Sequence, residues 1–536
     1  MQSGRGGGNM HRYLLGILVC VAIILGIWIF HSSPTPFQGT AWHVTPTVLN
    51  SKGESEYDVI VVGGGFGGLS AGAFLAKNGY KVLLVDKNDE VGGLCSGYEK
   101  DGFHFDYGAE DIEGLWERGS IRFLLDQLSL QQSTFFIPNT KRLIVDESFI
   151  DIGTSQNAME DALAKKFSHQ EKAIHEFFAK AKQVYFEIYD ADMIQEWGIV
   201  IPQELTKDVM PKVWNDTYAV THQNLLEWNE KSYQDVLDEY FTDLDLKRVL
   251  CNLLGYFGAV PAWTPASKVV ASSFGYFLYG GYHALHTPQY FAESLARYIT
   301  ERNGKVLSTT YVDEILVNSA GVAGVRVAKK TYKAPIVISN VNAKTTYLDL
   351  IDRKFLTPEF RSFIQQLPVG SSSITLHLAV PEKLSNYPAL IHDKDNQTYL
   401  TISSQDDSTL APQGQSAVVL RTVARFADFF GLSKDEETAL IKKRVDTLLV
   451  QGKALIPELA NGKVVKVMTP LSYGKLANLP QGALSWGEAS KAKKPYFKSP
   501  IVGLYLSSAS VEGSGVEFVI RNGILCAQDI MGWKTN

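Results

Sequence analysis

The distribution of hydrophobic positions divides the start of the chain into three stretches. An uncharged apolar run occupies residues 13–30; as a helix it would be about 27 Å long, close to the roughly 30 Å hydrocarbon core of a bilayer. Residues 31–56 contain several Pro, Ser and Thr and are typical of a linker. A short β-branched run at 57–62 predicts a buried parallel strand. We therefore expect an N-terminal membrane segment within residues 1–30, a linker, and then a folded region.

The apolar run has two interpretations, a retained membrane anchor and a cleaved signal peptide. The anchor is favoured because the run is longer than the apolar core of most signal peptides and no clear cleavage pattern follows it. Arg5 and Arg12 precede the run, whereas residues 31–51 contain no Lys or Arg. Because positive charges stay on the cytoplasmic side, we expect a single-pass protein with its bulk on the non-cytoplasmic side of the membrane.

The strand at 57–62 leads directly into a run of glycines at 63–68 that matches the pattern G-x-G-x-x-G. In this pattern the first glycine permits a tight turn, and the second lets a pyrophosphate approach the main chain. The third glycine lets the following helix pack closely on the strand. The predicted cofactor-binding glycines are Gly63, Gly65, Gly67 and Gly68.

The residues after the glycines complete a β-α-β unit. Residues 69–78 are rich in Ala and Leu and predict a helix, whose N-terminal N–H groups would face phosphates. Residues 81–85 predict the second strand, and Asp86 follows it, where a carboxylate can accept hydrogen bonds from ribose hydroxyls. An acid at this position favours a free ribose over a 2′-phosphate, so the unit is predicted to bind a dinucleotide other than NADP.

Composition narrows the class of function. The chain has 536 residues, of which 45% are hydrophobic and 20% charged, as in a globular protein with a sizeable core. The net charge of -6 predicts no basic surface for nucleic acid. The cysteines form no CxxC pair or Cys/His cluster, so neither a zinc site nor a disulfide framework is predicted.

The residues that follow Asp86 resemble FAD proteins of the amine oxidase and phytoene desaturase superfamily. Residues 86–93 resemble the superfamily's pattern of a strand, an acid and a Gly-Gly pair, and residues 102–108 resemble its G-x-x-F-D-x-G segment. The resemblance implies FAD as the cofactor. It also implies an α/β fold, in which a Rossmann-like FAD-binding domain of the glutathione reductase type carries an inserted α+β substrate domain. The cofactor residues that it adds are Lys87, Gly92 and Gly93.

Later segments resemble the branch that contains phytoene desaturases, carotenoid cis–trans isomerases and retinol saturases. Residues 119–128 resemble retinol saturases, and residues 310–315 resemble the strand whose valine brackets the adenine. Residues 337–340 resemble the branch's V-V-S-N strand, and residues 503–516 resemble its closing flavin segment. The resemblance implies further cofactor contacts at Val312, Gly515 and Val516.

Some positions depart from the family pattern. Ser508 and Ala509 occupy the place where members carry Gly with Asp, Glu or Ala, so the acidic contact of the closing segment is absent. Tyr279 replaces the basic residue common before the second Gly-Gly pair, and Leu94 replaces the Arg of amine oxidases. The resemblance therefore implies that FAD binds mainly through the first β-α-β unit.

The likeness and the hydrophobic pattern divide the folded region into alternating pieces. We expect FAD-binding pieces at 57–131, 264–343 and 499–536 and substrate pieces at 132–263 and 344–498. Apolar residues recur with helical spacing along 157–254, so the first substrate piece is expected to be helical. The second is expected to contain strands at 371–380, 418–420 and 464–468.

The catalytic residues are not identified by any spacing. His104, His283, His286 and Glu512 are candidate proton-transfer groups, and the thiol of Cys95 is either redox active or a small packed side chain. Aromatic residues are concentrated at 185–197 and 274–290. They form either an apolar tunnel that admits a polyene or other lipid from the bilayer or ordinary core packing.

Several functions stay open. The main prediction is an FAD-dependent desaturase or saturase of a carotenoid, retinoid or other isoprenoid-like chain, which exchanges a hydride at the flavin. The alternatives are an amine oxidase-like flavoenzyme, a flavin-dependent carotenoid isomerase, and a non-enzymatic lipid or prenyl carrier. The expected partners are a hydrophobic small molecule, the membrane, and a quinone or another electron acceptor, with no nucleic acid.

Overall fold

A computed structural model describes most of the chain after residue 55. The described residues are 56–145, 148–155, 157–188, 220–252, 254, 260–393, 395–484, 494–511 and 513–532, and all of them belong to one compact unit, residues 48–536. The expected membrane segment and nearly all of the expected linker lie outside them. Across the described ranges, no helix is both long and apolar enough to cross a membrane. The N-terminal anchor therefore stays a prediction.

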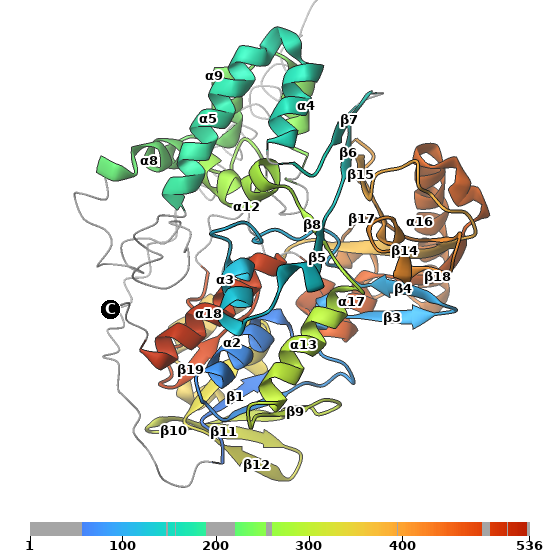
Figure 1. The fold of residues 1–536 in the computed structure, drawn as a ribbon. Coiled ribbons are helices and arrows are strands. Elements are labelled where there is room, and N and C mark those ends of the chain that lie inside the picture. The colour runs from blue at the N-terminus through green and yellow to red at the C-terminus, as the bar shows by residue number, and fades with distance from the viewer. Residues whose placement is uncertain are drawn as a thin grey trace, which may run out of the picture. The chain divides into compact units, whose positions relative to one another are not determined.

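A five-stranded parallel sheet carries the glycine-rich turn (Figure 1). Its order is β19–β13–β1–β2–β9, and every residue of β1 and β2 is buried, as expected for a parallel sheet covered on both faces. The strands are β1 (Val59–Val62), β2 (Val82–Val85), β9 (Lys305–Leu307), β13 (Ile336–Ser339) and β19 (Leu504–Leu506). Because all pairings are parallel, the carboxyl ends of these strands meet at one edge.

Four helices accompany this sheet: α2 (Phe66–Lys77), α3 (Ser120–Leu128), α13 (Pro288–Thr300) and α18 (Val516–Met531). The predicted helix at 69–78 and strand at 81–85 are confirmed as α2 and β2. Helix α2 packs against the other three. The contact with α18 is close at Gly523, where a Cβ atom would lie 2.9 Å from the main-chain nitrogen of Ala71. Small residues on both helices therefore bring α18 against the glycine-rich start of α2.

The segment predicted as a strand at 310–315 is only partly a strand. Residues 310–313 form a loop, and the antiparallel sheet β10–β11–β12 begins after it. The main chain of this loop is hydrogen-bonded to the segment after β2 and not to a strand: Thr309 N–H donates to Asn88 O at 2.6 Å, and Thr310 N–H donates to Asp86 O at 2.8 Å. These bonds tie the loop to the segment after β2. The three strands are β10 (Glu314–Asn318), β11 (Gly321–Val327) and β12 (Lys330–Lys333).

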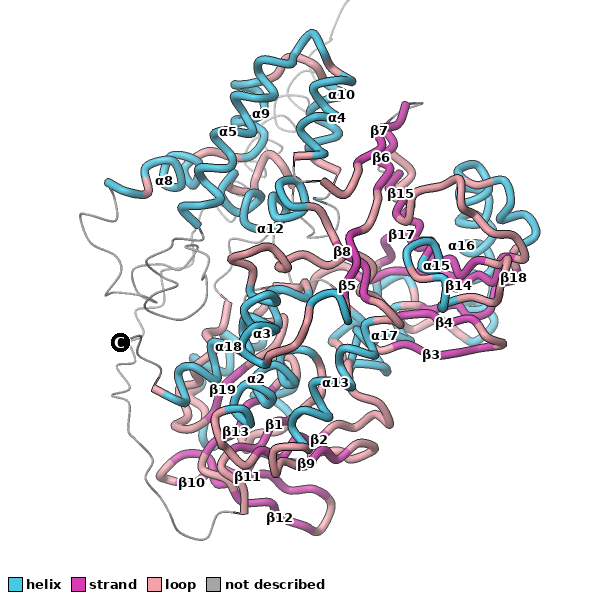
Figure 2. The backbone as a smooth tube through the Cα atoms, in the orientation of Figure 1, coloured by secondary structure: helices cyan, strands magenta, loops and turns pink. Residues whose placement is uncertain are grey.

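A second, seven-stranded sheet has the order β18–β14–β17–β16–β15–β6–β7, and Figure 2 shows its strands as a separate magenta group. The strands predicted at 371–380, 418–420 and 464–468 are confirmed. The seven strands are β6 (Lys141–Val145), β7 (Ser148–Ile152), β14 (Ser372–Val380), β15 (Leu390–Asp393), β16 (Thr398–Ile402), β17 (Ser416–Ala424) and β18 (Lys463–Met468). Helix α16 (Lys434–Leu455) contacts β16 and β17.

This sheet corrects the expectation that residues 132–263 are helical throughout. β6 pairs in parallel with β15, from residue Lys141 opposite Leu390 onward, so the two substrate pieces build one sheet. Upstream of it, β5 (Phe136–Pro138) pairs with β8 (Tyr282–Ala284). A hairpin of β3 (Gly97–Lys100) and β4 (Phe103–Asp106) packs on β17 through β4. The β4–β17 contact brings Asp106 close to the second sheet.

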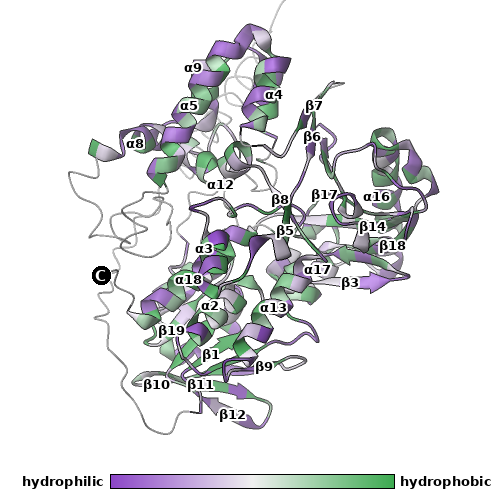
Figure 3. Cartoon of the chain, in the orientation of Figure 1, coloured by the Kyte–Doolittle hydropathy of each residue, from purple (hydrophilic) through white to green (hydrophobic). Residues whose placement is uncertain are grey.

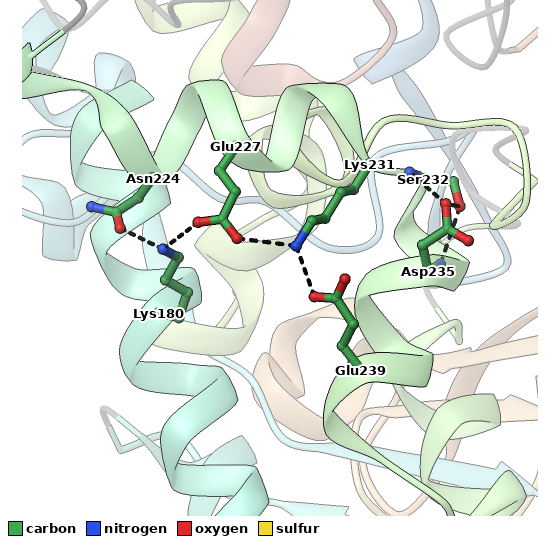
Figure 4. A network of polar contacts seen from close by, with 7 residues as sticks. All are labelled: Lys180, Asn224, Glu227, Lys231, Ser232, Asp235 and Glu239. Carbon is green, nitrogen blue, oxygen red and sulfur yellow. Dashed lines mark hydrogen bonds and ion pairs between the residues drawn. The ribbon is translucent and has the colours of Figure 1, made fainter.

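The remaining part of the first substrate piece is helical, as predicted for 157–254. Its helices are α4 (Ala158–Lys166), α5 (Glu171–Ile188), α8 (Gln223–Glu230), α9 (Tyr233–Tyr240) and α10 (Leu244–Leu250). Figure 3 shows hydrophilic and hydrophobic residues alternating along α4 and α5, typical of helices with one buried face. Charged contacts join these helices at the surface, where Lys180 and Lys231 both bind Glu227 and Lys231 also binds Glu239 (Figure 4).

Helix α12 (Ala266–Tyr279) lies in the interval 264–343, which was expected to be a piece of the FAD-binding half. In the structure α12 packs against α4, α5, α8 and α9. Its buried Phe274 has ring contacts with Phe177 and Phe178 of α5 at centroid distances of 5.9 Å. The packing therefore moves the boundary of the helical part from residue 264 to the end of α12.

Candidate functional site

A cofactor cavity of about 200 Å³ lies at the carboxyl ends of the parallel strands. It is lined by the turn after β1, the segment after β2, Asn340 after β13 and Ser508 beyond β19. Parallel α/β sheets bind ligands at this edge. The predicted cofactor residues that line it are Gly63, Gly65, Gly67, Asp86, Lys87, Gly92, Gly93 and Val312.

The glycine turn leaves room for a ligand against its main chain. Gly63 has a φ of +99°, which side chains rarely adopt. A Cβ atom at Gly65 would lie 2.6 Å from Asn340 Oδ1, and one at Gly67 would collide with the carbonyl oxygen of Ser507. The first N–H groups of α2, from Phe66 onward, have no acceptor within the helix. This cradle fits the diphosphate of FAD, which a helix N-terminus attracts.

Gly68 has a different role from the other predicted glycines because it does not line the cavity. A Cβ atom there would collide with Gly63 O and lie 2.9 Å from Val61 Cγ1. This is the close packing of helix on strand that the sequence pattern predicts for the third glycine. Gly92, with a φ of +112°, packs against the turn itself, since its N–H donates to Gly64 O at 2.7 Å.

Asp86 is held in place by two main-chain donors. Gly64 N–H donates to its Oδ2 at 2.5 Å and Asn88 N–H donates to its Oδ1 at 2.7 Å. The residue is 7% exposed and lines the cofactor cavity. Each carboxylate oxygen can accept a further hydrogen bond. Asp86 is therefore oriented to accept the ribose hydroxyls of FAD.

Asn340 is part of the site, although its role was not predicted. Its Oδ1 accepts the Gly65 N–H at 2.9 Å, and its Nδ2 donates to Ser507 O. One side chain thus fixes the glycine turn relative to the segment after β19. The V-V-S-N likeness contains this residue, but its contact with Gly65 follows only from the pairing of β13 with β1.

A second cavity, of about 250 Å³, adjoins the first. Both are lined by Leu94, Cys95, Leu479, Ala509 and Val519. The predicted cofactor residues Gly515 and Val516, at the N-terminus of α18, line the second cavity. The cofactor cavity and the second cavity are therefore adjacent parts of one candidate site. Two residues that depart from the family pattern, Leu94 and Ala509, lie at the junction of the two cavities, and both are small or apolar.

An ion pair lies in the wall of the second cavity. Glu110 Oε2 is 3.1 Å from Arg421 Nη2, and both residues line the cavity. Burial raises the pKa of the Glu110 carboxyl, while the Arg421 charge and a hydrogen bond with Thr401 oppose that rise. The neighbouring acid Asp111 is held by Lys141 Nζ at 2.5 Å.

The candidate proton-transfer groups from the sequence do not meet at this site. His104, His283 and His286 line neither cavity. Burial lowers the pKa of His283 to about 4, and His286 is 3.6 Å from Asp407 with half of its side chain exposed. Glu512 lies outside the described residues. The structure therefore gives no catalytic role to the three histidines.

Cys95 lies at the junction of the two cavities but has the properties of a packed thiol. Burial raises its pKa, and the nearby charge of Asp106 adds to the rise. A neutral thiol is a poor nucleophile. Among the aromatic residues of α12, Phe274 and Phe277 belong to the helical core, whereas Tyr276 lines the second cavity. Core packing therefore explains most of that aromatic cluster.

Comparison with known proteins places this geometry in a family. The model of the family of flavin containing amine oxidoreductases matches residues 66–531. The chain is similar to a chloroplastic prolycopene isomerase of Daucus carota, with 25% identity over 89% of this chain and 80% of that protein. It is also similar to an all-trans-retinol 13,14-reductase of Danio rerio, with 26% identity over 68% of this chain and 63% of the relative.

The fold is shared with solved structures. An oxidoreductase from Methanosarcina mazei superposes with a TM-score of 0.61 at 16% identity, over 89% of this chain and all of the other. The family match runs from the start of α2, directly after Gly65, to the end of α18, and the cradle beside the glycine turn fits FAD. The chain thus belongs to the flavin-containing amine oxidoreductase family and is an FAD-dependent oxidoreductase.

Proposed function

We propose that this FAD-dependent oxidoreductase acts on a polyene chain of the carotenoid or retinoid type. The observation that carries the proposal is the second cavity, which adjoins the cofactor cavity and has mostly apolar walls with a few polar groups. An apolar pocket with a few polar groups is typical of a site for a hydrophobic ligand. The names of the two relatives, a prolycopene isomerase and a retinol reductase, support the same substrate class. Apolar residues in its walls include Leu94, Ala109, Leu479, Ala483, Leu484 and Val519.

FAD, when bound, supplies the hydride chemistry of the reaction. The chain's own residues bind the cofactor and orient the substrate. The main chain at the start of α2 holds the diphosphate, and Asp86 accepts the ribose hydroxyls. Leu94 and Val519 at the cavity junction exclude water from the reacting atoms. A polyene has no charge, so apolar walls are enough to place its carbon chain.

The test is a reaction between the reduced protein and a polyene. FAD-bound protein is reduced with dithionite without oxygen, and a detergent-solubilised retinoid or carotenoid is added. We expect the oxidised flavin absorbance to return together with a saturated product. In the same preparation, amines added to the oxidised protein should release no hydrogen peroxide. Peroxide release with amines and no response to polyenes would contradict the proposal and support an amine oxidase.

A flavin-dependent cis–trans isomerase is a second candidate. The similarity to the Daucus carota prolycopene isomerase favours it, since that alignment covers 80% of the relative, against 63% for the retinol reductase. An isomerase would convert a cis polyene into its trans form without a net change in flavin absorbance. Chromatography of the polyene beside the flavin spectrum therefore separates the two candidates.

The membrane and an electron partner belong to the same proposal. A hydrophobic substrate is supplied by a bilayer, and residues 13–30 have the length and apolar composition of an anchor. The charges before this run favour a non-cytoplasmic position for the bulk of the chain. Protease protection of the full chain in sealed vesicles tests that orientation. In the direction of desaturation, a quinone or another acceptor would reoxidise the flavin in each turnover; in the direction of reduction, an electron donor would reduce it again.

A further inference from the structure

A buried charged cluster lies beside the second cavity, outside the FAD-binding residues. It consists of Asp106 at the end of β4, Glu110 in the following loop, and Arg421 on β17. Asp106 is 1% exposed and Glu110 is 4% exposed. Asp106 Oδ1 accepts no hydrogen bond from the part of the chain that the structure describes. The cluster therefore places two carboxyl groups around one guanidinium.

The charges of this cluster do not balance if both acids are ionised. Burial raises the pKa of Asp106 to about 7; the Glu110 charge adds to the rise and Arg421 opposes it. Burial also raises the pKa of Glu110. Neighbouring carboxyl groups in such a site share a proton and titrate as a pair. We therefore expect the two acids to hold one proton between them near neutral pH.

Other described cations near the cluster already have partners. Lys141 is paired with Asp111 at 2.5 Å, and Lys466 Nζ donates to the hydroxyl of Tyr107, the residue after Asp106, at 2.8 Å. Burial lowers the pKa of His392 well below its usual value, with Lys141 and Arg421 adding to the effect, so its ring is neutral. The titratable or charged groups that face the cluster are Cys95, Asp111, Lys141, His392, Tyr399 and Tyr473.

Glu110 is the best-placed acid in the cavity wall. Asp111 also lines the cavity, but both of its oxygens are bound, one by Lys141 and the other by Asn139 Nδ2. The Cys95 thiol and the Tyr399 phenol both have pKa values raised by burial, so each is a weak proton donor at neutral pH. Glu110 combines a cavity position, a shared proton, and an Arg421 partner that stabilises its ionised form.

We propose that Glu110 transfers a proton to and from a carbon of the bound polyene, and that Asp106 shares that proton and helps to restore it. This rests on the proposed function. In reduction, one carbon of a double bond would receive a hydride, which FAD would supply when bound, and the Glu110 carboxyl would give a proton to the adjacent carbon. Two C–H bonds replace the π bond, an O–H bond breaks, and a carboxylate paired with Arg421 remains. One proton from water then recharges the acid pair.

Infrared spectroscopy of the FAD-bound protein tests the shared proton without turnover. We expect Asp106→Asn and Glu110→Gln each to remove one protonated-carboxyl band at neutral pH, because the acid left behind ionises beside Arg421. The double variant should lose no more than either single variant. Unchanged bands in both variants, or additive losses in the double variant, would contradict the claim that Asp106 and Glu110 share one proton.

Reoxidation of dithionite-reduced flavin by a polyene tests the transfer itself. General acid catalysis contributes roughly 100-fold to 10,000-fold, so we expect Glu110→Gln to slow this reaction at least about 100-fold. Glu110→Asp, which keeps a carboxyl group, should recover part of the rate. Reoxidation by ferricyanide needs no carbon protonation and should not change. A Glu110→Gln rate close to that of the wild type would contradict the role of Glu110 as the proton donor.

The matched control is Glu113→Gln. Glu113 is another buried carboxyl, with a pKa raised well above its usual value by burial, yet it lines neither cavity. This variant should lose its own infrared band and keep the polyene reaction. Flavin absorbance and the unfolding midpoint report whether each variant is folded. A wild type whose reduced flavin no polyene reoxidises, and which isomerises no polyene, overturns the proposed function, whereas a reactive wild type with an equally reactive Glu110→Gln overturns only the role of Glu110.

Discussion

The two adjoining cavities are built from different parts of the polypeptide. Five glycines line the cofactor cavity, at the turn after β1 and at the Gly92–Gly93 pair. The second cavity is lined by side chains from segments far apart in the sequence, including Glu110, Tyr399 and Arg421. The cofactor cavity should therefore be sensitive to any added Cβ atom, whereas the second cavity should be sensitive to the identity and charge of its side chains.

The largest effect is expected from a side chain placed in the glycine turn. In Gly67→Leu the Cβ would collide with Ser507 O and approach Asn340 Nδ2 to 2.7 Å, so the cradle for the diphosphate would close. We expect the purified variant to contain almost no FAD by absorbance. Gly153→Ala is the control, because nothing lies within 4 Å of its added Cβ. Full FAD content in Gly67→Leu would contradict the assignment of the turn.

A large change in stability is expected when the ion pair in the second cavity is broken. Removing one partner of a buried pair costs about 3 kcal/mol or more, so Arg421→Met should lower the free energy of unfolding by about that amount. The double variant Arg421→Met/Glu110→Gln should recover most of it, because no unpaired charge is left. Urea unfolding measures both. Equal losses in the single and double variants would show that packing, and not charge, sets the cost.

Asp106 predicts a pH dependence of stability. Its pKa is raised to about 7 in the folded protein, so the folded state binds more protons than the unfolded state above about pH 4. Its contribution is complete below about pH 4 and is lost as the pH rises through about 7, by up to about 1.4 kcal/mol per pH unit. The stability of the wild type relative to Asp106→Asn should therefore fall over this range. A difference independent of pH would contradict the raised pKa.

A smaller effect is expected at the ribose acid. Asp86 accepts hydrogen bonds from the N–H groups of Gly64 and Asn88, and Asp86→Asn replaces one of its two acceptor oxygens with an NH₂ donor. A lost hydrogen bond to a charged group is worth about 1.5 kcal/mol, so FAD affinity should fall about tenfold. Asp58→Asn, at an exposed bond to Lys81 N–H, is the control. Flavin fluorescence titration of the apoprotein compares the two.

The smallest effect is expected at Cys95. It lines both cavities, but its thiol, whose pKa is raised by desolvation and by the Asp106 charge, is neutral. Cys95→Ser should keep the FAD content and change polyene reoxidation less than about threefold, a shift of less than about 1 kcal/mol. Stopped-flow absorbance measures this rate. A loss of the reaction in Cys95→Ser would give the thiol a chemical role that its surroundings do not support.

The same comparison explains what the sequence could predict. The first β-α-β unit is continuous in the chain, so its strands, glycine turn and Asp86 follow from local pattern and spacing. Gly68 also has the packing role that the motif predicts. Val312 was expected on a strand but lies in a loop, because that loop is tied to the segment after β2 by long-range hydrogen bonds.

The second cavity could not be predicted because its contacts depend on topology. Glu110 and Arg421 are 3.1 Å apart, yet β4 and β17 meet only when the hairpin packs on the seven-stranded sheet. That sheet itself joins β6 to β15 from different pieces of the chain. Neither pairing has a local signature. Asn340 was missed for the same reason, since its position beside Gly65 follows from a parallel pairing between distant strands.

The central claim is that the two cavities form one site, in which FAD fills the first and reaches the second at Gly515 and Val516, and a polyene occupies the rest of the second. Ala483 is 1% exposed and lines only the second cavity, so Ala483→Trp should fill that cavity and leave the cofactor in place. The most direct measurement is polyene reoxidation of the dithionite-reduced variant. We predict full FAD content, normal reoxidation by ferricyanide and no reoxidation by the polyene. A polyene rate equal to that of the wild type would contradict the claim.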